Sequence, residues 1–135
     1  RFMFDEQISL ATRFDLPLII HSVQATEDVT DLLKSHSKSR GVIHAYSGSI
    51  QQAENLLKIN FSFGFGNTLT NPQAYKLHDI VKFLPIESIV IETDDHKNPD
   101  ELIQVAERVA RIKKLTVDEV IDQCDQNTRN IFNID

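Results

Sequence analysis

Apolar positions along the chain switch repeatedly between a spacing typical of helices and one typical of strands. Phe4, Ile8, Ala11 and Phe14 are three or four residues apart, which predicts an amphipathic helix that ends before Pro17. Short runs rich in β-branched and aromatic residues then recur, and a stretch with helical spacing follows each of them. The predicted strands are residues 17–21, 41–45, 60–66 and 88–93.

Helix-start signals occur in the segments between these strands. Ser49 with Gln52, and Thr116 with Glu119, have the spacing of a capping box, in which two side chains satisfy the first free amides of a helix. Asn71 followed by a proline predicts a helix cap and first turn. The predicted helices begin near residues 26, 49, 71, 98 and 116, and the third of them runs to about residue 83.

The order of these elements predicts the fold class. A leading helix followed by four strand–helix units predicts an α/β fold with about four parallel strands, right-handed crossovers and flanking helices. By pattern alone, a small open α/β sheet and one half of a TIM-type (β/α) barrel both fit. In the third strand, phenylalanines at positions 61, 63 and 65 alternate with Ser or Gly, so one face of that strand is kept small.

Three residues of the kind that bind metal ions stand at the ends of predicted strands. His21 and His44 each end an apolar run, and Asp94 follows the fourth run. In barrels of alternating strands and helices, catalytic residues lie at the carboxyl ends of the strands. Two histidines and an aspartate there suit a divalent metal ion, which favours a hydrolase. A satisfied rim histidine and a solvated strand end are the structural alternatives.

Polar and small residues accompany this trio. Glu92 is two residues from Asp94 on the same strand, so both carboxylates share a face, and Glu92 is expected beneath the metal as a supporting group. Ser47 and Gly48 form a small-residue turn before a capped helix, where backbone amides could hold a phosphate oxygen. A plain helix start fits the same residues.

Counting alternate residues back from these strand ends gives the inner face of the sheet. We expect that face to include Ile19, Val42, Phe63 and Val90 and to be largely uncovered in a half barrel, which favours association.

Composition limits the interpretation further. The chain has 135 residues, enough for a single domain over residues 1–135 but short of the roughly 250 residues of a complete eight-stranded barrel. The net charge of −6, without a basic stripe, offers little attraction to phosphate backbones. The lone Cys124 and the lack of a membrane-length apolar run favour a cytoplasmic protein without a membrane partner. A sequence that begins with Arg1 is consistent with a fragment, a processed product or an incomplete sequence record.

Four segments in order resemble the TatD family of metal-dependent deoxyribonucleases. The segments are residues 17–21 (PLIIH), 41–49 (GVIHAYSGS), 91–94 (IETD) and 127–132 (NTRNIF). The likeness runs from about Phe4 to the C-terminus and corresponds to the C-terminal half of that family's barrel, which favours the half barrel over the open sheet. The family's first four strands, with a His-x-His pair and a bridging Glu, have no counterpart in these residues.

The resemblance implies a function and a partner. It implies hydrolysis of phosphodiester bonds in DNA with two divalent ions, Mg, Mn or Zn. His21 and His44 match ligands of one ion, and Asp94 matches a ligand of the other and the residue that orients the attacking water. The chain alone is then expected to be catalytically incomplete and to pair with a second copy or with an N-terminal half. The alternative is a non-catalytic half-barrel remnant that acts as an oligomerising or binding module.

Overall fold

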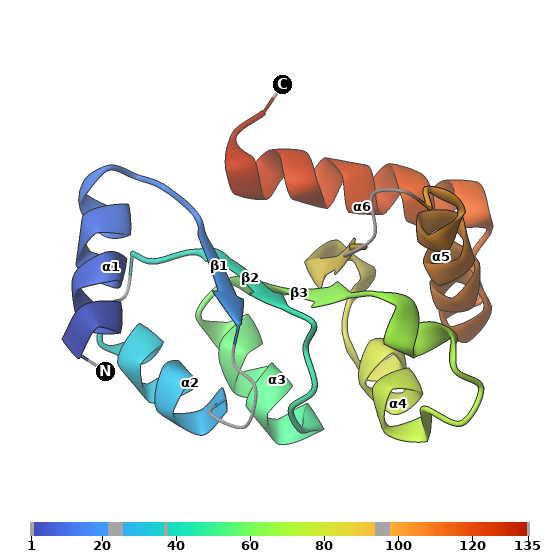
Figure 1. Cartoon of the computed structure of the whole chain (residues 1–135), viewed down its shortest axis with the longest axis horizontal. Helices are drawn as coiled ribbons and strands as arrows, with labels where there is room; N and C mark the ends of the chain where they lie inside the picture. The colour runs from blue at the N-terminus through green and yellow to red at the C-terminus, as the bar shows by residue number, and fades with distance from the viewer. Residues whose placement is uncertain (1, 22–25, 37, 94–97, 135) are drawn as a thin grey trace.

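The computed structural model describes residues 2–21, 26–36, 38–93 and 98–134. In this part of the chain, strands and helices alternate as the sequence predicts (Figure 1). The strands are β1 (Leu18–His21), β2 (Gly41–His44), β3 (Phe61–Phe65) and β4 (Ile89–Ile91). The helices are α1 (Phe2–Arg13), α2 (Thr26–Lys34), α3 (Ile50–Lys58), α4 (Tyr75–Phe83), α5 (Asp100–Lys113) and α6 (Val117–Phe132), and short 3₁₀ turns are η1 (Asn67–Thr70) and η2 (Ile86–Ser88).

The strands of the described residues form a single parallel sheet in the order β1-β2-β3-β4. A doubly wound sheet reverses its strand order near the middle, whereas a barrel adds each strand beside the preceding one. Helices α2, α3 and α4 lie next to one another along one side of the strands (Figure 1). The fold is therefore a half TIM-type barrel, as the resemblance implies, with parallel strands and flanking helices.

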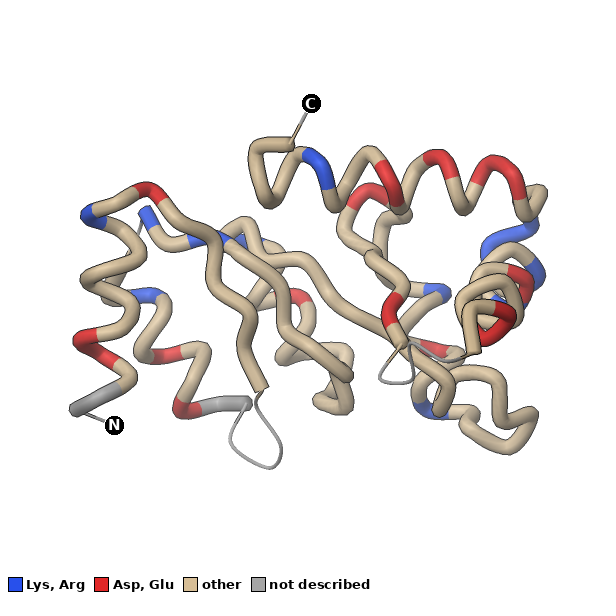
Figure 2. Tube along the Cα trace, turned by 45° about the horizontal axis from the view of Figure 1, so that its top comes forward, with Lys and Arg blue, Asp and Glu red and all other residues tan. Residues whose placement is uncertain are grey.

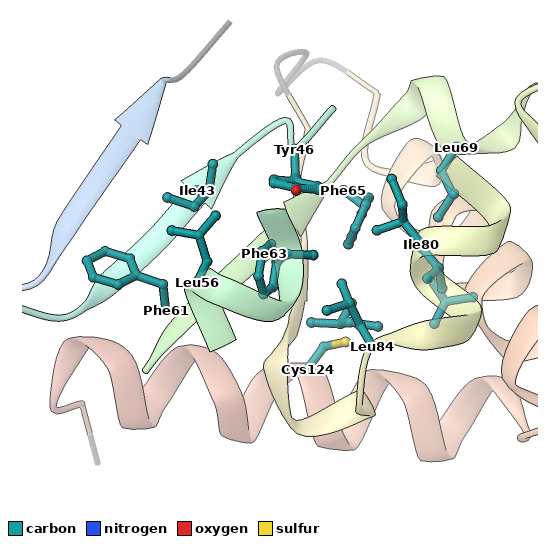
Figure 3. Close-up of a cluster of buried hydrophobic side chains, with 14 of the residues drawn as sticks. Ile43, Tyr46, Leu56, Phe61, Phe63, Phe65, Leu69, Ile80, Leu84 and Cys124 are labelled. Carbon is teal, nitrogen blue, oxygen red and sulfur yellow. The ribbon is translucent and has the colours of Figure 1, made fainter. Parts of the chain in front are cut away.

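The sheet face that the helices cover carries large side chains. Ile43 pairs with Phe63, and Phe63 pairs with Ile89, so these side chains project to the same face, where all three are fully buried. Figure 3 shows Phe63 inside this cluster with Leu56 of α3 and Cys124 of α6. This cluster is the core that fixes the strands relative to the helices.

The inner face of β3 carries small residues, which makes our prediction for Phe63 wrong. Val42 pairs with Ser62, and Gly64 pairs with Val90, so Ser62 and Gly64 lie on the inner face. Paired residues of neighbouring parallel strands point to the same side, and this register decides the face. Counting back from ligand residues fails for β3 because no predicted ligand ends that strand.

The inner face is also better covered than predicted. Val42 and Val90 are 5% and 8% exposed, whereas Ile19 on the outermost strand β1 is 58% exposed. Phe14 and Leu16, just before β1, are exposed as well. Apolar surface that is open to water therefore gathers at the β1 end of the sheet.

Helix α6 packs against β4, the strand at the edge of the sheet opposite β1. Asn127 is buried, and its side-chain amide donates to the backbone oxygens of Ile86 and Ile89 at 2.8 Å each. Thr116 and Glu119 form the predicted capping box at the start of this helix. The segment at residues 127–132 therefore anchors β4 and does not reach the carboxyl ends of the strands.

The segment between β3 and α4 differs from the prediction. The helix expected at Asn71 begins at Tyr75, because the Asn71 side chain accepts a hydrogen bond from the Gln73 amide, at 2.9 Å, and so closes a turn. Before it, η1 buries Leu69. This turn therefore separates η1 from α4.

The described residues carry no basic stripe and no membrane-length apolar helix, as the composition indicates. Acidic positions follow one another along α6, and basic positions are scattered over several elements without forming a stripe (Figure 2). None of the helices in the described residues is long and apolar enough to cross a membrane.

Candidate metal centre

His21 and His44 end neighbouring strands and lie directly opposite each other. The pairing of β1 with β2 puts them in register, and their imidazole centroids are 4.3 Å apart with the ring planes tilted by 58°. His21 is exposed and His44 is partly buried. The two rings thus share the rim at the carboxyl end of the sheet, where the sequence predicts them.

Glu92 orients His44 from the end of β4. Its Oε2 lies 2.8 Å from His44 Nδ1, and its Oε1 accepts a hydrogen bond from the Ala45 amide at 2.7 Å. The side chains of His44 and Glu92 are 17% and 19% exposed, so this contact is shielded from water. A carboxylate oxygen at this distance accepts from a protonated Nδ1, and a histidine held in this way would bind a metal ion through Nε2.

Gly64 provides the space for this carboxylate. A Cβ built on Gly64 would lie 2.3 Å from Glu92 Oε2, so the carboxylate would have to move away from its present place. The Glu92 amide also donates to the Phe65 oxygen at 3.0 Å, which continues the strand pairing to the level of the site. Sequence reasoning missed Gly64 and the Ala45 amide, although the small residues that alternate with phenylalanine in β3 were a signal for the former.

Asp94, the predicted third ligand and catalytic residue, lies outside the described residues. Thr93 precedes it, and its hydroxyl donates to a carboxylate oxygen of Glu101 at the start of α5. In the described part of the chain, no three His, Cys, Asp or Glu side chains form a group that could hold a metal ion. The adjacent imidazoles and the supporting carboxylate nevertheless fit a metal in chemical type, because metal-binding histidines donate their other nitrogen to such groups.

Ser47 and Gly48 lie in the connection from β2 to α3. Ser49 and Gln52 form the predicted capping box there, in which the Ser49 amide donates to Gln52 Oε1 at 2.9 Å and the Gln52 amide donates to Ser49 Oγ at 3.1 Å. The buried Tyr46 hydroxyl donates to the Ser49 oxygen at 2.6 Å. The capping box occupies the Ser49 amide, one of those that the phosphate interpretation would use, which favours the plain helix start.

A pocket of about 170 Å³ opens beside the Glu92 carboxylate. It lies over the carboxyl ends of β2, β3 and β4, and the turn η1 and the first turn of α5 line it. Ser47 belongs to its rim, and Gly64 and Glu92 form the part nearest to His44. The pocket is therefore linked to His44 through Glu92, which lines the pocket and contacts the imidazole.

Comparison with known proteins identifies the class of protein that this fold and site represent. A family model described as "TatD related DNase" matches residues 1–133, and the chain belongs to the TatD family.

Individual relatives agree with this membership. The metal-dependent hydrolase YjjV of Escherichia coli is 33% identical over 99% of this chain and 56% of its own length. YabD of Bacillus subtilis, also named a metal-dependent hydrolase, is 33% identical over 98% of this chain and 57% of its own length. The chain thus spans about half the length of these relatives.

A solved structure supports the fold directly. The crystal structure of the Escherichia coli TatD homologue YjjV superposes with a TM-score of 0.88 at 32% identity, over 97% of this chain and 55% of that one.

A more distant relative, the human 3'-5' RNA nuclease TATDN2, is 26% identical over 98% of this chain and 20% of its own length.

Proposed function

We propose that the chain forms half of the active site of a metal-dependent phosphodiesterase that cleaves DNA. The observation that carries this proposal is the pair of strand-end histidines, of which His44 is oriented by Glu92 at 2.8 Å. Membership of the TatD family and the names of the relatives support hydrolysis with divalent metal ions.

His21 and His44 would hold one divalent ion, Mg, Mn or Zn, through imidazole nitrogens, and Asp94 would belong to a second ion. Bound there, such ions lower the pKa of water and neutralise charge on a phosphoryl group. Glu92 would keep the His44 proton on Nδ1 and so fix the orientation of the ring. The Ala45 amide donates to the same carboxylate and holds it in place. Asp94 would orient the attacking water toward phosphorus.

The described residues contribute only part of such a two-metal ligand set. The relatives contain almost as much sequence again beyond the part that this chain matches. We therefore infer that full activity needs residues equivalent to those of the other half barrel. Without them, these residues would bind metal but hydrolyse slowly. Metal binding with no hydrolysis at all, even when the other half barrel is supplied, would favour the non-catalytic alternative.

A chimeric barrel tests the proposal. This chain would replace the matching half of Escherichia coli YjjV, and Mn²⁺-dependent cleavage of a fluorescent oligodeoxynucleotide would be measured. We expect cleavage that chelator abolishes and that His44→Ala or Asp94→Asn lowers by about 100-fold or more.

His36→Ala is the matched control, since His36 lies before β2 and pairs with Asp5 at 2.5 Å, at the other end of the strand from His44. It should leave cleavage unchanged. A folded chimera whose cleavage survives His44→Ala and Asp94→Asn would contradict the proposal.

A further inference from the structure

The pocket next to Glu92 has the build of a ligand subsite. Its apolar lining includes Phe65 of β3, Leu69 of η1 and Leu77 of α4, of which Leu77 is the partly exposed one. Its rim carries Ser47, Asn67 and further hydroxyl-bearing residues of the strand ends. Sites for small ligands combine such apolar walls with a few placed polar groups. We infer that this pocket binds the uncharged base-and-sugar part of a nucleotide, next to the phosphate that the proposed metal centre would cleave.

The charge of the described lining residues disfavours a phosphate in the pocket itself. Glu92 and Glu101 both line it, and among the described residues around it there is no Lys or Arg. A phosphate inside would therefore face two carboxylates without a Lys or Arg among the described lining residues. An uncharged ring with donors and acceptors meets no such penalty.

The orientation of the Asn67 side chain directs its NH₂ group toward a ligand as a donor. The Thr70 hydroxyl shares its one hydrogen between the Asn67 backbone oxygen, at 2.6 Å, and Asn67 Oδ1, at 3.0 Å. With Oδ1 accepting, the side chain presents its NH₂ group, which suits the carbonyl oxygens and ring nitrogens of a base. Thr68, the next residue on the rim, adds an exposed hydroxyl that both donates and accepts.

Size and position restrict the ligand. A pocket of about 170 Å³ is well below the roughly 300–1,000 Å³ of sites for drug-sized molecules, so it fits one ring system and part of a sugar. Glu92 lines the pocket and contacts His44, so a ligand in the pocket would lie beside the proposed metal centre. This inference rests on the proposed phosphodiesterase function for its choice of a nucleoside.

Amide signals of the ¹⁵N-labelled chain, followed in chelator without metal, test the subsite. Titration with thymidine or deoxyadenosine should shift the signals of Ser47, Asn67 and Thr68, and titration with inorganic phosphate should leave them in place. Asn67→Asp keeps the shape and the Thr70 bond but replaces the NH₂ group by a charged oxygen. It should raise the nucleoside Kd by about fivefold or more.

Gln73→Glu is the matched control, because it adds the same charge on the same connection, at an exposed residue outside the pocket. It should leave the nucleoside Kd unchanged. The subsite is overturned if nucleosides shift none of these signals, if phosphate shifts them equally, or if both variants weaken binding alike.

A substrate without base or sugar separates this inference from the proposed function. The chimeric barrel should hydrolyse bis(p-nitrophenyl) phosphate with Mn²⁺ if the proposed function holds. Hydrolysis without nucleoside binding would overturn the subsite alone, and nucleoside binding without hydrolysis would overturn the phosphodiesterase alone.

Discussion

Single side chains at the rim depend on one another through Glu92. Its carboxylate touches His44 and the Ala45 amide, and it occupies the space that Gly64 leaves open. Changing any of these groups should therefore affect the others, which a double-mutant cycle measures.

Gly64→Ala should destabilise the chain by about 1–3 kcal/mol, because the new methyl group would displace the Glu92 carboxylate. Glu92→Ala should also destabilise it, by about 1–3 kcal/mol, since it leaves two donors without their acceptor. The double variant should lose clearly less than the sum, as judged by urea unfolding. Strict additivity would show that Gly64 is needed for another reason.

Cys124 gives the chain a pH-dependent stability. Burial raises the pKa of its thiol from 9.0 to about 11, so the unfolded chain ionises at lower pH than the folded one. Stability from this group is complete below about pH 9 and falls by on the order of 2 kcal/mol as the pH rises to 11. Cys124→Ala should flatten that part of the profile in thermal unfolding from pH 8.5 to 10.5, and an unchanged slope would contradict this assignment.

At the scale of elements, the register of the strands places the site. The pairing of β1 with β2 brings His21 opposite His44, and the pairing of β3 with β4 brings Gly64 beside the strand that carries Glu92. Gly41 lies at the start of the first pairing with φ of +155°, and a Cβ there would be 1.9 Å from the Leu18 oxygen. The β1–β2 pairing therefore depends on a residue without a side chain.

Gly41→Ala should destabilise the chain by about 3 kcal/mol or more, since it combines a strained φ with a backbone clash. Gly66→Ala is the control, because its nearest contact would be 3.3 Å, and its loss should be much smaller. Urea unfolding curves of the two variants give the comparison. Similar losses would show that β1 does not need this close approach.

The type and order of the helices and strands were predictable from the sequence. The sheet face on which a side chain lies and the residue at which a helix begins were less so. Capping boxes at Ser49 and Thr116 are local chemistry, and both are confirmed. The start of α4 was missed because the Asn71 side chain accepts from the Gln73 amide in a turn instead of capping the helix. The face of Phe63 was missed because it follows from pairing with Ile43, a contact between distant residues.

In the candidate site, too, local features were predicted and contacts between distant residues were not. The strand ends of His21 and His44 were evident from the apolar runs before them, and the structure puts these residues opposite each other. The contact of Glu92 with His44 joins residues 48 positions apart (92 − 44), and no local pattern gives its geometry. Asp94 remains a prediction, because it lies outside the described residues.

At the scale of the whole molecule, the β1 end of the sheet is open. In the described residues β1 pairs on one side, with β2, and Ile19, Phe14 and Leu16 beside it are more than half exposed. Exposed apolar surface next to an unpaired strand edge favours association. We therefore propose that this chain pairs through β1, with a second copy or with an N-terminal half barrel.

Light scattering on the purified chain should show a concentration-dependent dimer or larger species. Ile19→Lys puts a charge on the open edge and should shift the mass toward the monomer. Ile103→Lys is the control, since Ile103 is 48% exposed on α5, away from β1. A monomer at all concentrations, or equal effects of both changes, would contradict pairing through β1.

The central claim is that His21 and His44 bind the same metal ion. Mn²⁺ broadens the NMR signals of nearby nuclei, so titration of the chain, followed on the imidazole signals, tests this claim most directly. His36, which precedes β2 and pairs with Asp5 of α1, is the internal reference. We expect the His21 and His44 signals to broaden together at the lowest Mn²⁺ concentrations while the His36 signal persists. Broadening of all three in parallel, or of His36 first, would contradict the claim.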